Sequence, residues 1–175
     1  RYALQHAGSV KYTEAWGWLI WNGRKWESDE TGAVMRLAKR TVRGLYGEAQ
    51  RAMDSAKAAI KRLEEAQDLD EETLARTTEK IQEAQNLANA LLSWAKKSQS
   101  RTRLDAMIAL AKSEREIAAR PSDFDNSPWM LNVQNGTLDL RTGVLHPHSP
   151  DRMLTKIAGA SYDPDAECPT WQAFL

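Results

Sequence analysis

The sequence predicts an α+β protein that is mostly helical, with an N-terminal tryptophan-rich β-hairpin, central helices and a small C-terminal β-meander. Three observations lead to this class. Aromatic and β-branched residues flank an Asn-Gly pair near the N-terminus, residues 31–97 are rich in Ala, Glu, Lys, Arg, Gln and Leu, and two more Gly-containing turns follow residue 130. We expect two segments: residues 1–120, with the hairpin and helical bundle, and residues 121–175, with the meander and a connector.

The N-terminal hairpin is predicted over residues 10–27, which hold four of the seven tryptophans. Residues 2–6 before it are expected to be a short helix. Asn22-Gly23 supplies the positive φ angles of a tight type I′ turn. Trp21 and Trp26 flank this turn and are expected to pair across it.

Two functions are open for the remaining tryptophans. Trp16 and Trp18 lie two residues apart and share one strand face, which favours a place in the core against the first helix. The alternative is a set of stacking platforms for single-stranded bases, with Arg24 and Lys25 at the turn meeting phosphates.

Four helices are predicted in the centre of the chain, over residues 30–46, 48–67, 70–97 and 101–118. Gly44 and Gly47 are expected to loosen the end of the first helix. Asp70 is a predicted N-cap for the third. The second and third helices carry narrow apolar seams near heptad spacing, so we expect them to pack as an antiparallel hairpin.

Short strands are predicted after the helices, over residues 129–133, 137–140 and 144–145, with turns at Asn135-Gly136 and residues 141–143. A proline-containing connector at 146–150 and a loop at 161–169 follow. A helix is expected to begin near Thr170.

Composition argues against a uniformly basic surface, because 24 Lys and Arg balance 24 Asp and Glu. Any DNA contact must therefore be local. One cysteine and three scattered histidines fall short of a structural zinc site, and no apolar run approaches the roughly 18 residues that cross a bilayer. We expect a cytoplasmic domain without metal, cofactor or catalytic residues.

Basic residues supply the candidate DNA contacts in three groups. The densest group lies at the end of the third helix and the start of the fourth, a second forms one face of the first helix, and a third lies at the hairpin turn. The groups are Lys96, Lys97, Arg101 and Arg103; Arg36, Lys39, Arg40 and Arg43; and Arg24 and Lys25. The alternatives are cations that complement a helix C-terminus, surface ion pairs and a solvated helix face.

Acidic residues and histidines are expected to be structural. Asp123 and Asp125 lie in a turn where Asp hydrogen-bonds its own backbone, and Asp139 is expected to face outward from a strand. His146 and His148 are expected in a rigid surface loop. Cys168 is expected to have a structural role.

Two stretches resemble the segment that precedes the superfamily 3 helicase domain in primase-helicases of phages, plasmids and large DNA viruses, poxviruses included. They read DNSPWMLNVQNGTLDLRTG at residues 125–143 and YDPDAECPTW at residues 162–171. The opening, with Arg1-Tyr2, His6 and the tryptophan-rich residues 16–26, is similar to the start of the same segment.

The resemblance implies a primase region in some members, then this segment, then a hexameric ATPase that uses ATP and Mg²⁺ to move on DNA. The phosphate loop G-x-x-x-x-G-K-[ST] does not occur in this sequence, so we expect the helicase chemistry to lie beyond Leu175. The implied partners are single-stranded or forked DNA, a helicase domain in cis and, in a hexamer, other copies of the parent chain, in the cytoplasm of a bacterial host.

The sequence therefore predicts a non-catalytic accessory domain of a replicative primase-helicase that assists DNA engagement and hexamer assembly. The alternative is a structural spacer, or a docking domain for replication proteins, that never contacts DNA. A primase activity in this segment ranks last, because no nucleotide or metal constellation supports it.

Overall fold

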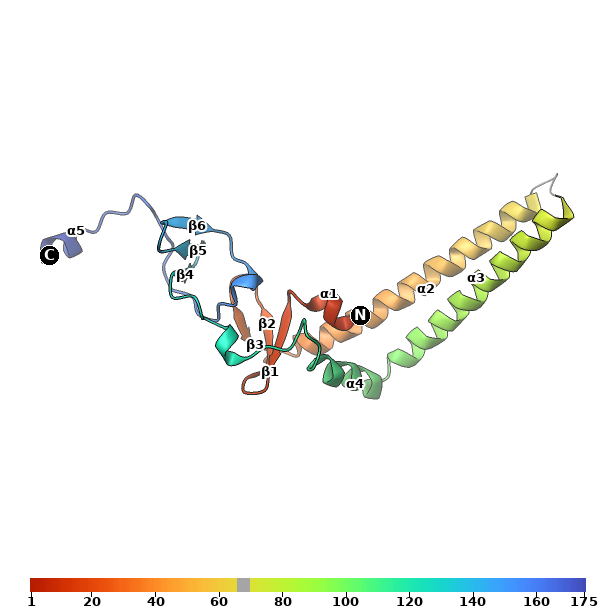
Figure 1. Ribbon diagram of the computed structural model, residues 1–175, viewed down its shortest axis with the longest axis horizontal. Helices are drawn as coiled ribbons and strands as arrows, with labels where there is room; N and C mark the ends of the chain where they lie inside the picture. Colours follow the sequence, from red (N-terminus) through yellow and green to blue (C-terminus); the bar gives the residue numbers. More distant parts are fainter. Residues whose placement is uncertain (66–69) are drawn as a thin grey trace. The chain divides into compact units, whose positions relative to one another are not determined.

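A computed structural model describes residues 1–65 and 70–175 (Figure 1). Its contacts group the chain into two compact units, one formed by residues 1–5 and 32–114 and the other by residues 6–31 and 115–175. About half of the chain is helical, and the α+β class is confirmed. The domain boundary expected near residue 120 stays a prediction.

Long helices α2 (Ala33–Glu65) and α3 (Glu71–Ser98) dominate the first unit, with α4 (Arg101–Ala111) after them. Figure 1 shows α2 and α3 side by side and running in opposite directions. The predicted antiparallel hairpin is therefore confirmed. Small residues make the packing close, because Ala49, Ala56, Ala88 and Ala95 are almost fully buried. No described helix has both the length and the apolar character needed to cross a membrane.

The first two predicted helices are one helix, α2, and Gly44 and Gly47 lie inside it. Each glycine costs a helix only about 1 kcal/mol relative to Ala. The buried seam continues past both, with Val42, Leu45 and Ala49 all covered. Tertiary packing of this seam outweighs the local cost.

Asp70 caps α3 as predicted, since its carboxylate accepts hydrogen bonds from the Thr73 backbone N–H (2.8 Å) and hydroxyl (2.7 Å). These bonds hold the pKa of Asp70 below its ordinary value. The break predicted before it falls mainly on residues 66–69, outside the described residues.

The predicted fourth helix ends early, at Ala111 rather than residue 118. Residues 117–119 adopt a strand-like path instead, because the Tyr12 N–H donates to the Ile117 carbonyl (2.9 Å) and the Ala119 N–H donates to the Tyr12 carbonyl (2.8 Å). Ile117 is fully buried. A long-range backbone pairing thus replaces the last helical turns.

The short helix α1 (Tyr2–His6) precedes the antiparallel sheet of the second unit, which consists of β1 (Val10–Thr13), β2 (Gly17–Trp21) and β3 (Trp26–Ser28). Of α1, only His6 belongs to this unit. Trp21 and Trp26 pair across the β2–β3 connection, as predicted, with ring centroids 5.8 Å apart. That connection spans four residues, 22–25, rather than the two of a type I′ turn. The Asn22 side chain accounts for this, because its Oδ1 accepts both the Arg24 and Lys25 N–H groups at 2.9 Å.

The core of this sheet consists of Leu19, Trp26 and Phe124. Trp26 is fully buried and its indole N–H donates to the Pro150 carbonyl (2.9 Å). The prediction that Trp16 and Trp18 form the core is wrong. Trp16 precedes β2, is 45% exposed and rests on Phe124, and Trp18 lies on the opposite face of β2 from the inward Leu19, against Tyr12.

A second antiparallel sheet is formed by β4 (Met130–Val133), β5 (Gly136–Asp139) and β6 (Val144–His146), which confirms the predicted meander. Short 3₁₀ turns lie at Pro121–Asp123 and Pro150–Arg152, and α5 (Pro169–Phe174) follows near the predicted position. The β4–β5 turn is Gln134-Asn135, since Val133 pairs with Gly136.

Gly136 therefore lies in a strand, where a Cβ atom would meet the His146 carbonyl oxygen at 2.4 Å. We predict that Gly136→Ala lowers the free energy of unfolding by about 1–3 kcal/mol, because backbone of β6 must shift. Urea denaturation followed by circular dichroism measures this. Gly159→Ala is the matched control, since a Cβ there meets nothing within 4 Å. Equal stability of the two variants would contradict the close approach.

Candidate nucleic-acid interface

The α3–α4 basic cluster consists of Lys96, Lys97, Arg101 and Arg103, and all four side chains are exposed. Lys96 and Lys97 occupy the last turn of α3, and their carbonyls accept the Gln99 N–H. Ser100 is the N-cap of α4. The short connection between the helices therefore brings the four cations into one local group.

Part of this cluster is explained without DNA. Two lysines in a last helical turn complement the negative end of the helix dipole. Arg101 Nε lies 3.6 Å from Asp105 Oδ2, one helical turn away. The arginine is 93% exposed, so this pair contributes little and competes weakly with a phosphate.

A hollow of about 530 Å³ beside the cluster adds an aromatic surface. Arg103 lines it together with Arg1, Tyr2, Trp94 and Leu110. Trp94 is 51% exposed. Cations next to an accessible indole are the combination that single-stranded nucleic acid binds.

Sequence reasoning missed Trp94. The heptad spacing could have indicated its exposure. Trp94 lies seven residues after Leu87, and both are one position before the buried seam residues Ala88 and Ala95. A large aromatic residue at that register remains partly exposed when the seam is narrow.

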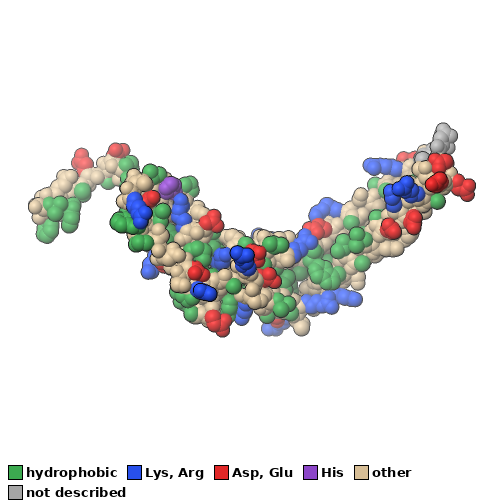
Figure 2. All heavy atoms as spheres, in the orientation of Figure 1, with side chains coloured by type: hydrophobic (Ala, Val, Ile, Leu, Met, Phe, Trp, Pro, Cys, Tyr) green, Lys and Arg blue, Asp and Glu red, His purple; other side chains and the backbone are tan. Residues whose placement is uncertain are grey.

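The α2 basic stripe consists of Arg36, Lys39, Arg40 and Arg43. All four side chains are exposed. They lie on the helix face opposite the buried residues Val34, Ala38 and Val42. Figure 2 shows basic and acidic side chains interspersed along the visible face of the hairpin helices. Elsewhere on α2, the hydrogen bond and ion pair that Arg1 forms with Glu48 hold the pKa of Glu48 below its ordinary value.

The turn cations Arg24 and Lys25 belong to the other unit. Arg24 Nη1 donates to Gln134 Oε1 (2.8 Å), and the Arg24 carbonyl accepts from Asn132 Nδ2 (2.9 Å). Lys25 is half-buried. The structure thus gives Arg24 a partner within the protein and separates this pair in sequence and fold from the other two groups.

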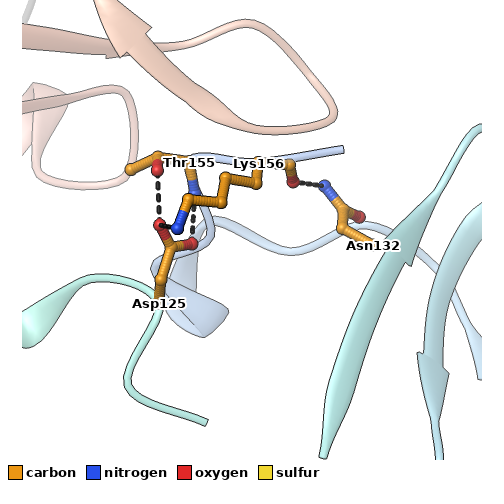
Figure 3. Close-up of polar contacts among 4 residues, drawn as sticks. All are labelled: Asp125, Asn132, Thr155 and Lys156. Atoms are coloured by element: carbon orange, nitrogen blue, oxygen red, sulfur yellow. Dashed lines mark hydrogen bonds and ion pairs between the residues drawn. The ribbon is translucent and has the colours of Figure 1, made fainter. Parts of the chain in front are cut away.

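The carboxylates outside the basic groups hold the backbone. Asp123 accepts the Arg120 N–H (2.7 Å), a local bond as predicted. Asp139, predicted to face outward from its strand, accepts the Arg141 N–H (2.9 Å). The prediction is wrong for Asp125, which reaches thirty residues along the chain (Figure 3).

Asp125 accepts the Thr155 N–H at 2.8 Å and the Thr155 hydroxyl at 2.5 Å, and Lys156 Nζ lies 3.9 Å away. Its φ of +50° is in the left-handed region, which Asp tolerates better than most residues. This long-range contact forms because Thr155 presents two donors, its backbone N–H and its side-chain hydroxyl, to the two carboxylate oxygens. Figure 3 shows Asn132 binding the same segment through the Lys156 carbonyl.

His148 is half-buried rather than part of a surface loop, with Nδ1 3.0 Å from Asn132 Oδ1. Since that oxygen only accepts, His148 donates from Nδ1. Cys168 is exposed, so no packing role is visible for it. Across residues 1–65 and 70–175, no three His, Cys, Asp or Glu side chains gather to hold a metal ion.

We predict that Asp125→Ala lowers the free energy of unfolding by about 1–3 kcal/mol, because two Thr155 donors lose their acceptor. Asp125→Asn should cost less than about 1 kcal/mol, since Asn offers an acceptor and a donor and tolerates the same φ. Thermal and urea unfolding of both variants test this. A similar loss in the two would show that charge, rather than hydrogen bonding, holds the segment.

Comparison with known proteins identifies the family of the chain. No curated protein and no solved structure matches it. A family model described as "D5 N terminal like" matches residues 1–175. The chain therefore belongs to the D5_N family, the N-terminal region of D5-like superfamily 3 primase-helicases.

Proposed function

We propose that the chain is a non-catalytic accessory domain of a replicative DNA primase-helicase, which engages single-stranded or forked DNA and assists assembly of the hexameric helicase. The observation that carries this proposal is the α3–α4 basic cluster beside the half-exposed Trp94. Membership of the D5_N family supplies the helicase context.

The chemistry of the cluster suits a DNA backbone. Lysine and arginine side chains neutralise phosphates and release counterions, which gives affinity without sequence readout. The net charge of zero means that this affinity arises from a local patch and is modest. A modest, sequence-independent contact fits a domain that guides a strand while a motor moves it.

The motor itself belongs to the rest of the parent protein in this proposal. A helicase domain in cis supplies ATP and Mg²⁺ binding and forms the hexamer, in phage- or plasmid-borne replicons within the bacterial cytoplasm. The α2 basic stripe, with Arg24 and Lys25, is a secondary set of proposed contacts.

A second candidate function is docking of a replication partner without DNA contact. An apolar hollow of about 590 Å³ on the α2–α3 hairpin favours it. Ala56, Leu63, Ile81 and Leu87 line this hollow, and Leu87 is 64% exposed. Exposed apolar surface of this kind is typical of protein contacts.

Charge reversal separates the two functions. We predict that Arg101→Glu with Arg103→Glu weakens binding of labelled single-stranded DNA by about ten-fold or more at low salt. It should also reduce the slope of log affinity against log salt by about 1.4, since two phosphate contacts are lost. Fluorescence anisotropy at several salt concentrations measures both.

Lys57→Glu with Lys61→Glu is the matched control. It reverses the same charge on an exposed part of α2 and breaks the Lys61–Glu65 pair, as the test breaks Arg101–Asp105. If both double variants bind DNA as tightly as the unmodified chain, the docking function is favoured. Equal weakening by both would mean that overall charge, not the cluster, attracts DNA.

A further inference from the structure

One feature of the residue 125–143 motif lies outside its sheet. Trp129 precedes β4 and is 46% exposed, although it belongs to a segment whose other conspicuous residues build the meander. The Arg141 guanidinium lies over its ring, 5.1 Å from the centroid. An exposed indole with a stacked arginine forms a planar, positively charged surface.

Backbone hydrogen bonds hold both partners of this pair. The Leu140 N–H donates to the Trp129 carbonyl (2.8 Å), which ties Trp129 to the end of β5. Asp139 Oδ1 accepts the Arg141 N–H (2.9 Å), and the Asp139 carbonyl accepts the Gly143 N–H (2.8 Å). The turn that presents Arg141 is therefore fixed, so little ordering is needed when a ligand binds.

A hollow of about 440 Å³ opens beside the pair. Asn126, Ser127 and Asp139 contribute its polar side chains, alongside Trp129 and Arg141. The combination of an aromatic face, a cation and amide, hydroxyl and carboxylate groups matches a nucleotide. A base stacks on the part of the half-exposed ring that Arg141 leaves open, the guanidinium meets a phosphate, and the short polar groups lie at the base edge.

We propose that Trp129 and Arg141 form a binding site for one unpaired base of single-stranded DNA. This site rests on the proposed function and deepens it, since it assigns a particular base-stacking residue in the second unit. Stacking tolerates every base, so the site does not require a particular sequence. It lies in the second unit, whereas the α3–α4 basic cluster lies in the first.

The test compares labelled oligo(dT) with an abasic strand of equal length, which carries the same phosphates without bases. Anisotropy with the full chain should show oligo(dT) binding about ten-fold more tightly. Trp129→Ala should lower this ratio several-fold and leave abasic binding unchanged, with Trp94 accounting for any remaining preference, and Trp129→Phe should retain most of the ratio. Arg141→Gln should weaken both probes and lower the salt slope by about 0.7.

Trp16→Ala is the matched control, because Trp16 has nearly the same exposure (45%) but rests on Phe124 instead of a cation. Circular dichroism verifies the fold of each variant, and Arg141→Gln, at an exposed position, tests the site independently of any packing loss at Trp129. The Arg101→Glu, Arg103→Glu double variant should weaken both probes without changing their ratio.

Equal affinity of the unmodified chain for the two probes would overturn the base site and leave the proposed function standing. An unchanged ratio in Trp129→Ala would do the same. Binding of neither probe would overturn both. Tighter binding of oligo(U) than oligo(dT) would overturn the assignment of the base to DNA.

Discussion

The second unit depends on the hydrogen bonds made by the buried side-chain amide of Asn132. Its Nδ2 donates to the carbonyls of Arg24 (2.9 Å) and Lys156 (3.0 Å), and its Oδ1 accepts from the Thr137 hydroxyl (3.2 Å) and from His148 Nδ1 (3.0 Å). One amide thus joins the β2–β3 loop, β5 and two later segments. A buried amide left without these partners would cost more than each bond contributes, so the network is satisfied as a whole or lost.

The two units meet different physical constraints. The α2–α3 hairpin is held by a narrow seam of small residues such as Ala56 and Ala88, which leaves large side chains such as Leu87 and Trp94 on its surface. The second unit is held by aromatic packing around Trp26 and by polar networks at Asp125 and Asn132. Exposed aromatic residues next to cations occur in both units, Trp94 with Arg103 and Trp129 with Arg141. Arg141 contacts the Trp129 ring directly, whereas Trp94 and Arg103 line the same hollow.

Local patterns were sufficient to predict the Asp70 cap, the helical hairpin and the meander, because periodicity and turn residues act over a few positions. Local patterns did not predict the features that contacts between residues far apart in the sequence determine. The continuation of α2 through Gly44 depends on packing, the path of residues 117–119 depends on pairing with Tyr12, and the burial of Trp26 depends on the Pro150 carbonyl. For the candidate site, charge spacing was enough to group Lys96 to Arg103. The side chains that share the hollow with Arg103, and the ring beneath Arg141, are visible only in three dimensions.

The most direct test of a locally charged DNA-binding domain is fluorescence anisotropy of the unmodified chain with single-stranded and forked DNA across a range of salt. A neutral chain that contacts DNA through the α3–α4 basic cluster and Arg141 should bind modestly, and its log affinity should fall with log salt at a slope of about −3 to −4 for a single strand. Absence of binding at low salt, or binding that salt does not weaken, would contradict the account and leave docking of a replication partner as the role of the domain.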